Sequence, residues 1–227
     1  MRNKILLGLA VVAAGLLAWN LHKIFDVLPD EANQGAIYRI IYFHVPSAIT
    51  CFTGFFAAMV AGLLYLWRGD LKYDVFAASA VEVGLVFASV VLATGSIWAR
   101  IIWGVWWAWD ARLTTMLICW LTYAGYLMLR RAIDEPTQRA RLSAVLSVFG
   151  FTEVVIVYKA NVWWRTLHPG PVLSIRNGGG MAPGMEAAIY WNLLALLCLA
   201  AILVSVRMRQ EEFSREIDSL RREAHSY

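Results

Sequence analysis

Six long apolar segments dominate this sequence and restrict what it can fold into. They cover approximately residues 5–22, 46–67, 75–99, 112–129, 142–158 and 185–206. A helix needs about 20 apolar residues to cross the hydrocarbon core of a bilayer. Inside lipid every backbone N–H and C=O must be paired, and a helix pairs them within the segment itself. We therefore expect an all-α membrane protein with six transmembrane helices.

Composition supports the membrane class. Of the 227 residues, 60% are hydrophobic and 16% are charged, which is too apolar a balance for a soluble domain. We expect one membrane domain over residues 1–206 and a charged cytoplasmic tail over residues 207–227. In that tail Phe213, Ile217 and Leu220 have the spacing of an amphipathic helix. The spacing fits a solvated terminal helix and a docking site for a cytoplasmic partner equally well.

The distribution of Lys and Arg predicts the orientation. With the N-terminus inside, thirteen of the 20 basic residues fall in cytoplasmic segments and seven fall outside. Cytoplasmic loops are enriched in Lys and Arg, so the sequence predicts an N-in, C-in topology, with segments 23–45, 100–111 and 159–184 outside. The first segment follows a basic start, as a secretory signal does. It lacks a small-x-small cleavage site, so we interpret it as a true span.

The net charge of +4 reflects this topology and gives no indication of nucleic-acid binding. The three cysteines lie in three different spans, and neither C-x-x-C nor C-x-x-C-H occurs. We therefore expect no disulfide framework and no covalent haem attachment.

An external Trp-rich segment separates the third and fourth spans. Residues 103–110 read WGVWWAWD, with indoles at Trp103, Trp106, Trp107 and Trp109. One or two Trp residues at a helix end are typical of a membrane interface. Four of them form a broad aromatic surface that suits a large planar macrocycle. If the segment is helical, Trp103, Trp106 and Trp107 share one face.

Asp110 ends this run and has two interpretations. It is a candidate for contact with the ligand, and it is also a suitable N-cap for the fourth span. The pair Trp163 and Trp164 either extends the aromatic surface or anchors the fifth span.

Two of the four histidines are predicted to reach the same membrane side as the Trp run. His44 precedes the second span in YFHVPSA, with Pro46 in the first turn of that span, and His168 lies in the last external loop in WWRTLHPGP. Two imidazoles beside an aromatic surface indicate axial ligation of haem iron. We interpret His22 as an interfacial residue and His225 as incidental.

Three external arginines are candidate partners for the two haem propionates. Arg100 and Arg112 flank the Trp run, and Arg165 lies three residues before His168. A guanidinium group binds both oxygens of a carboxylate at once. Ordinary positive charge at helix ends explains each of these arginines equally well.

Two acidic residues fall inside predicted spans, Glu82 in the third and Glu153 in the fifth. Such residues are costly in lipid and indicate function by default. Hydrogen bonds to a neighbouring helix, or contact with a partner subunit, are the alternatives that the sequence leaves open.

These motifs resemble those of a known family. WGVWWAWDARLTT resembles the tryptophan-rich WWD signature of the haem-handling, or WWD-domain, proteins. YFHVPSA and WWRTLHPGP resemble the external histidine motifs of one branch, cytochrome c maturation protein C, also called haem exporter protein C. The resemblance covers the whole six-span layout. It implies that the four Trp residues and Asp110 contact haem b, and that His44 and His168 are its axial ligands.

The same resemblance implies a setting and a set of partners. It implies a bacterial cytoplasmic (inner) membrane protein with its haem site on the periplasmic side. Haem would be presented to a periplasmic haem chaperone, maturation protein E, during c-type cytochrome maturation. Further implied partners are an ABC-type ATPase, membrane subunits of the maturation complex and a small single-span subunit. The chain is expected to be no enzyme.

Other functions fit the sequence less well. A cytochrome c synthase (haem lyase) carries extra spans and further histidines within the membrane, and a b-type electron-transfer subunit needs histidine pairs in facing helices. No predicted span here contains a central His. A transporter running on Glu82 and Glu153 lacks the sign of a discontinuous helix. A zinc site of His44, His168 and Asp110 would leave the Trp run without a purpose.

Overall fold

The computed structural model describes residues 2–170, 173, 181 and 184–225, and within them the regular secondary structure is helical apart from one isolated β-bridge between Glu31 and Gly35. The all-α expectation is confirmed for this part of the chain. The α-helices are α1 (Arg2–His22), α2 (Ile41–Arg68), α3 (Leu71–Ile102), α4 (Ala111–Ala132), α5 (Pro136–Trp163) and α6 (Met185–His225). A short π-helix, η1 (Lys23–Val27), and a 3-10 helix, η2 (Ala36–Ile40), lie between α1 and α2.

Five helical segments are long and apolar enough to cross a membrane. They are Asn3–Val27, Ala36–Arg68, Leu71–Ile102, Pro136–Trp163 and Met185–Arg221. The sixth expected span corresponds to α4, whose 22 residues fall outside this set. A multi-pass membrane protein is therefore supported, while the count of six and the N-in, C-in topology stay predictions.

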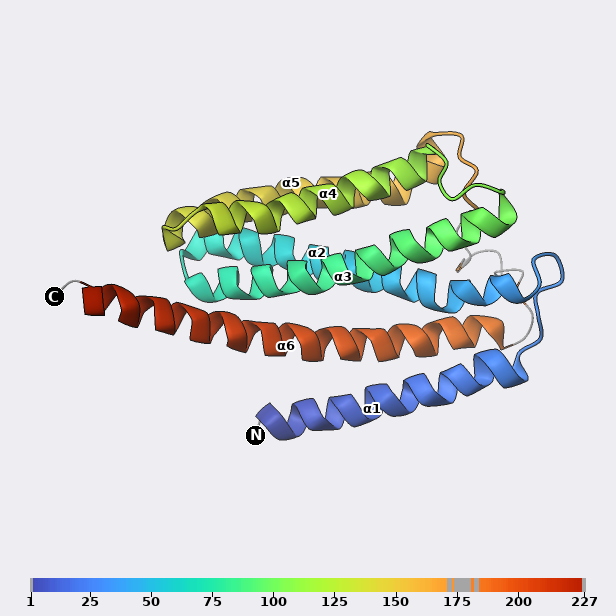
Figure 1. Ribbon diagram of the computed structural model, residues 1–227, viewed down its shortest axis with the longest axis horizontal. Coiled ribbons are helices and arrows are strands. Elements are labelled where there is room, and N and C mark those ends of the chain that lie inside the picture. The colour runs from blue at the N-terminus through green and yellow to red at the C-terminus, as the bar shows by residue number, and fades with distance from the viewer. Residues whose placement is uncertain (1, 171–172, 174–180, 182–183, 226–227) are drawn as a thin grey trace.

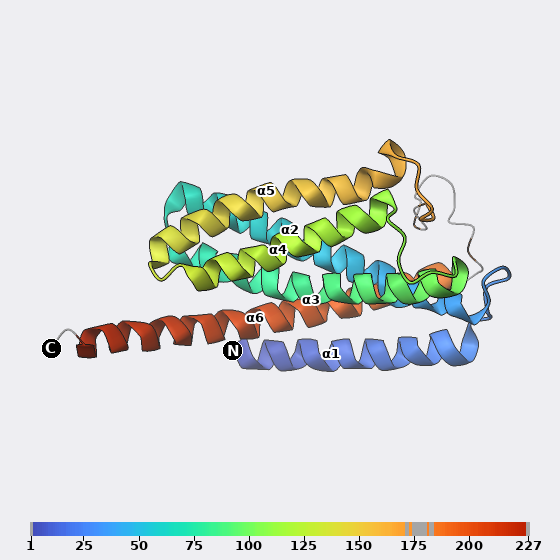
Figure 2. The ribbon, with the colours of Figure 1, turned by 45° about the horizontal axis from the view of Figure 1, so that its top comes forward.

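The helices pack in successive layers (Figure 1). The pair α4 and α5 lies on the pair α2 and α3, α6 lies along the other side of α2 and α3, and α1 packs on α6. The second view shows the same order, with α6 extending beyond the end of the bundle (Figure 2). The connections α1–α2 and α3–α4 and residues 164–170 after α5 gather at one end of the bundle, and the turns α2–α3 and α4–α5 lie at the other.

The α2–α3 contact is close because glycines face it. A Cβ on Gly54 would lie 3.2 Å from the Ala80 carbonyl oxygen, and one on Gly84 would lie 2.9 Å from the Phe55 ring. Phe55 stacks on Tyr123 of α4, with ring centroids 3.6 Å apart. These buried aromatic and small residues tie α2, α3 and α4 into one core.

The intramembrane acids pair with neighbouring helices. Glu82 of α3 accepts a hydrogen bond from Arg207 Nη2 of α6 at 2.8 Å. Glu153 of α5 accepts one from Thr122 of α4 at 3.0 Å, and its other carboxylate oxygen is buried with no hydrogen-bond partner among the described residues. Of the alternatives left open by the sequence, the structure supplies the contact with a neighbouring helix for both acids.

A buried charge cluster closes the end of the bundle opposite the long connections. Asp74 of α3, whose side chain is 2% exposed, binds Arg130 of α4 through both carboxylate oxygens. Arg215 of α6 binds the same carboxylate and also Glu211. The beginning of the charged tail is thus a continuation of α6 that is bound to the bundle.

Candidate functional site

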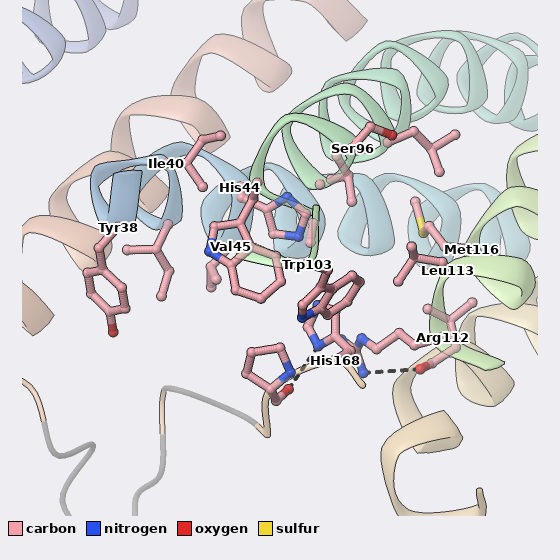
Figure 3. A pocket seen from close by; sticks show the side chains of 18 of the residues that line it. Tyr38, Ile40, His44, Val45, Ser96, Trp103, Arg112, Leu113, Met116 and His168 are labelled. Atoms are coloured by element: carbon pink, nitrogen blue, oxygen red, sulfur yellow. Dashed lines mark hydrogen bonds between the residues drawn. The ribbon is translucent and has the colours of Figure 1, made fainter. Parts of the chain in front are cut away.

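A cavity of about 340 Å³ lies at the end of the bundle where the long connections gather. Its walls come from η2, α2, α3, α4 and the segment that follows α5, and most of its lining side chains are apolar (Figure 3). The volume falls in the range of small-molecule sites, roughly 300–1,000 Å³.

His44 and His168 both line this cavity. Their ring centroids are 6.5 Å apart, and the ring planes are inclined by 33° (Figure 3). The expectation that His44 precedes its helix is wrong. Helix α2 begins at Ile41, so His44 lies in its first turn and Pro46 lies inside the helix. His168, by contrast, lies in the irregular segment after α5.

The ring orientation of His44 is fixed from α3. His44 Nδ1 lies 2.8 Å from Thr94 Oγ1, and that hydroxyl donates to the Val90 carbonyl at 2.6 Å. A hydroxyl has one hydrogen, so Thr94 accepts from the Nδ1–H of His44. The other ring nitrogen, Nε2, then carries an unshared lone pair.

His168 has the same tautomer by a different route. Its Nδ1 lies 2.8 Å from the Pro169 carbonyl oxygen, which can only accept. Burial and the nearby Arg112 guanidinium lower the pKa of His168 below its ordinary value, although the bond to Pro169 opposes this. The imidazole is therefore neutral at neutral pH, with Nε2 unprotonated.

The Trp run divides between the cavity and the surface. Trp103 and Trp107 line the cavity, whereas Trp106 and Trp109 do not and are 62% and 79% exposed. The conditional expectation of a helix with Trp103, Trp106 and Trp107 on one face is wrong. Helix α3 ends at Ile102, and Gly104 follows with φ +76°, a left-handed conformation that favours glycine and ends the helix.

Two side chains in the cavity wall, Arg112 and Trp107, carry N–H groups that could donate hydrogen bonds to a ligand. Arg112 is partly buried, donates to the Val157 carbonyl at 3.2 Å and to Asn161 Oδ1 at 3.3 Å, and forms no ion pair within the described residues. The Trp107 indole nitrogen is buried and has no acceptor in the same part of the chain. Both groups are suited to an anionic oxygen of a ligand.

Arg100 and Arg165 lie outside the cavity. Arg100 donates to the Gly104 carbonyl just beyond the end of α3. Arg165 lines a separate hollow together with Trp109 and Asp110. Of the three candidate arginines, the structure brings only Arg112 to the histidines.

Asp110 caps α4, as one of its two interpretations predicted. Its carboxylate accepts the backbone N–H of Arg112 at 2.9 Å, and it also accepts the Thr166 hydroxyl and the Leu167 N–H, each at 2.7 Å. Partial burial raises the pKa of Asp110, but these hydrogen bonds outweigh burial and bring the pKa below its ordinary value. The carboxylate is therefore ionised at neutral pH.

Comparison with known proteins decides the family. The family model described as Heme exporter protein C matches residues 1–223. The chain belongs to the heme exporter protein C family. A relative with that name from Escherichia coli K12 is 37% identical over 82% of this chain and 74% of its own length. One from Bradyrhizobium diazoefficiens is 37% identical over 96% and 82%, and one from Paracoccus denitrificans is 34% identical over 85% and 80%.

In this member of the heme exporter protein C family the cavity also contains residues that sequence reasoning missed. Trp98 lines it, and its indole N–H donates to Oε1 of Gln34 at 2.8 Å. Gln34 belongs to the α1–α2 connection and also lines the cavity. Trp98 also makes an edge contact with Trp103, at 5.0 Å between ring centroids. Thr94 and Trp98 are spaced i, i+4 on α3, and this spacing is the signal that could have grouped them.

The described part of the chain does not support the alternative of a zinc site. There, no group of three or more His, Cys, Asp or Glu side chains is placed to hold a metal ion. Asp110, its third expected ligand, is not among the residues that line the cavity.

Proposed function

We propose that this chain holds haem b in the cavity between His44 and His168 and presents it to a periplasmic haem chaperone. Membership of the heme exporter protein C family gives the general role, which is haem delivery for cytochrome c maturation. The chaperone, the haem type and the two ligands are the proposal's own additions.

The separation of the two imidazoles carries the proposal. A metal–imidazole bond is about 2.0–2.1 Å long, and a ring radius on each side places two centroids flanking one metal roughly 6 to 6.5 Å apart. The centroids of His44 and His168 are 6.5 Å apart. Both rings carry their hydrogen on Nδ1, so both Nε2 atoms have the lone pair that iron ligation requires.

The surrounding residues fit the rest of a haem. Trp98, Trp103 and Trp107 provide aromatic surface in an otherwise apolar wall, which suits a porphyrin ring. The Arg112 guanidinium and the Trp107 N–H, which has no acceptor among the described residues, would supply donors for propionate oxygens. Haem would supply the iron that the histidines hold, and the chain's own residues would orient it and keep its apolar face out of water.

The cellular setting and the partners are those that the family resemblance implies, and the expected topology agrees with that setting. We propose a bacterial inner-membrane protein whose cavity end faces the periplasm, assembled with an ABC-type ATPase, membrane subunits of the maturation complex and a small single-span subunit. The proposed role needs no bond-forming catalysis by the chain and no nucleic acid.

Replacement of each histidine tests the proposal. Purified full-length protein loaded with haem is expected to show a low-spin absorption spectrum. His44→Ala and His168→Ala should each convert it to high-spin or lose the haem. His22→Ala is the control, because His22 is exposed at the end of α1 and pairs with Asp26. Unchanged spectra in both cavity variants would refute axial ligation by these residues.

A further inference from the structure

The hydrogen bonds of the Asp110 side chain connect it to the segment that carries His168, and Asp110 does not line the cavity. Its carboxylate lies outside the cavity lining, and both of its oxygens accept hydrogen bonds from the chain. We infer that Asp110 positions the His168 ligand and makes no contact with haem. This inference rests on the proposed function, because it concerns how one of the two proposed ligands is held.

A continuous set of hydrogen bonds joins Asp110 to the histidine. Asp110 Oδ1 accepts the Thr166 hydroxyl, and Thr166 Oγ1 in turn accepts the backbone N–H of His168 at 3.1 Å. Asp110 Oδ2 accepts the N–H of Leu167, the residue next to the ligand. The carboxylate therefore fixes the backbone on the N-terminal side of His168.

A second anchor holds the other side of the ligand. Asn161, in the last turn of α5, donates from Nδ2 to the Pro169 carbonyl at 2.8 Å. That carbonyl is also the acceptor for His168 Nδ1. The ring and the backbone of His168 are thus set by Asp110 from the start of α4 and by Asn161 from the end of α5.

These bonds matter because His168 has no helix to support it. Helix α5 ends at Trp163, and residues 164–170 follow without regular structure. His44 instead belongs to α2 and is held by helix packing. Hydrogen bonds to an ionised carboxylate are about twice as strong as neutral ones, so Asp110 is the strongest single support of this segment.

Two substitutions separate the positioning role from the capping role. In Asp110→Asn an amide oxygen in place of Oδ1 still accepts from Arg112 and Thr166, and Asn is a good N-cap. The amide nitrogen in place of Oδ2 faces the Leu167 N–H, donor against donor, and that bond is lost. Thr166→Val keeps the shape of the side chain and removes the link between Asp110 and the His168 N–H.

The experiment is a haem titration of full-length protein in detergent, read by absorption and electron paramagnetic resonance spectra. Asp110→Asn and Thr166→Val are each expected to weaken haem binding roughly ten-fold, the size typical when a group that orients a metal ligand is removed. Each should also raise the high-spin fraction, and added imidazole should restore the low-spin spectrum. The double variant removes both the Leu167 bond and the Thr166 link, so it should bind haem more weakly than either single variant.

Asp70→Asn is the matched control. Asp70 caps α3 in the same way, accepting the Lys72 N–H at 3.0 Å, but lies at the other end of the bundle. The inference is overturned if Asp110→Asn and Thr166→Val bind haem like Asp70→Asn. It is also overturned if Asp110→Asn weakens binding while Thr166→Val does not, which would indicate direct contact with haem.

Failure of the proposed function gives a different result. In that case the unmodified protein shows no low-spin spectrum, or His168→Ala leaves that spectrum unchanged. Thr166→Val keeps the inference testable even where Asp110→Asn fails to accumulate in the membrane, because Thr166 lies outside every helix.

Discussion

His44 Nδ1 lies 2.8 Å from the hydroxyl oxygen of Thr94, one helix away. The bond holds Nδ1 of His44 toward α3 and leaves Nε2 free to bind iron, so Thr94 orients the proposed ligand. Thr94→Val keeps the volume and removes the acceptor. We expect haem affinity to fall roughly ten-fold, measured by absorption titration. Thr94→Ser should restore it, and equal affinity in the Val and Ser variants would contradict this role.

The split of the Trp run predicts unequal effects of its members. Trp107→Ala removes a cavity wall and a buried N–H donor, so the amount of haem that copurifies with the protein should fall. Trp109→Ala removes a side chain that is 79% exposed, and the haem content should not change. Equal losses in the two variants would show that the run acts as one surface. Equal retention would make it an interfacial belt alone.

Arg112 is expected to recognise the propionates. Arg112→Gln should lower haem affinity by roughly ten-fold, the value of one charge-assisted hydrogen bond. Haem dimethyl ester, whose propionates carry no charge, should bind to this variant and to the unmodified protein with similar affinity. Arg100→Gln and Arg165→Gln are the controls, because both residues lie outside the cavity. Continued preference for free haem in Arg112→Gln would rule out this role.

The buried cluster at the far end of the bundle predicts a stability effect. Asp74→Ala leaves Arg130, whose side chain is 9% exposed, without its bidentate partner. Breaking a buried ion pair costs about 3–5 kcal/mol, so thermal unfolding in detergent should occur at a markedly lower temperature. Lys72→Ala breaks only an exposed pair with Asp70 and should have little effect. Similar unfolding temperatures for the two variants would contradict the structural role of Asp74.

Topology can be tested with reporter fusions. Fusions within 130–141 should report the cytoplasm, and fusions within 159–184 should report the opposite side. The reason is the excess of Arg in the first of these segments. Both reporters on one side would break the expected orientation and with it the periplasmic placement of the cavity.

The sequence predicted the features that depend on local pattern. Apolar length predicted five helices that are long and apolar enough to cross a membrane, and Asp110 predicted the start of α4. The external placement expected for both His44 and His168 predicted that they could meet, and the structure brings their ring centroids to 6.5 Å. Each of these depends on properties of one segment, or on the side of the membrane that a segment is expected to reach.

The features that it missed depend on tertiary contacts. Trp98 of α3 donates a hydrogen bond to Gln34, which lies in the α1–α2 connection. The two residues are far apart in the sequence, so no local sequence pattern predicts that contact. Trp106 and Trp109 leave the cavity because the chain turns at Gly104, which a helical projection of the run ignores. The start of α2 at Ile41 was not predicted, because proline is typical of the first turn of a helix and Pro46 therefore indicated a later start.

The two walls that face each other across the cavity are maintained by different forces. The His44 wall belongs to packed helices, and moving it means separating apolar side chains along α2 and α3. The His168 wall rests on a few hydrogen bonds, each with a net contribution of about 1 kcal/mol or somewhat more where charge is involved. A ligand bound between them therefore contacts one wall that helix packing fixes and one wall that a few hydrogen bonds hold. Displacing the His168 wall breaks only those hydrogen bonds and leaves the packing of α2 and α3 intact.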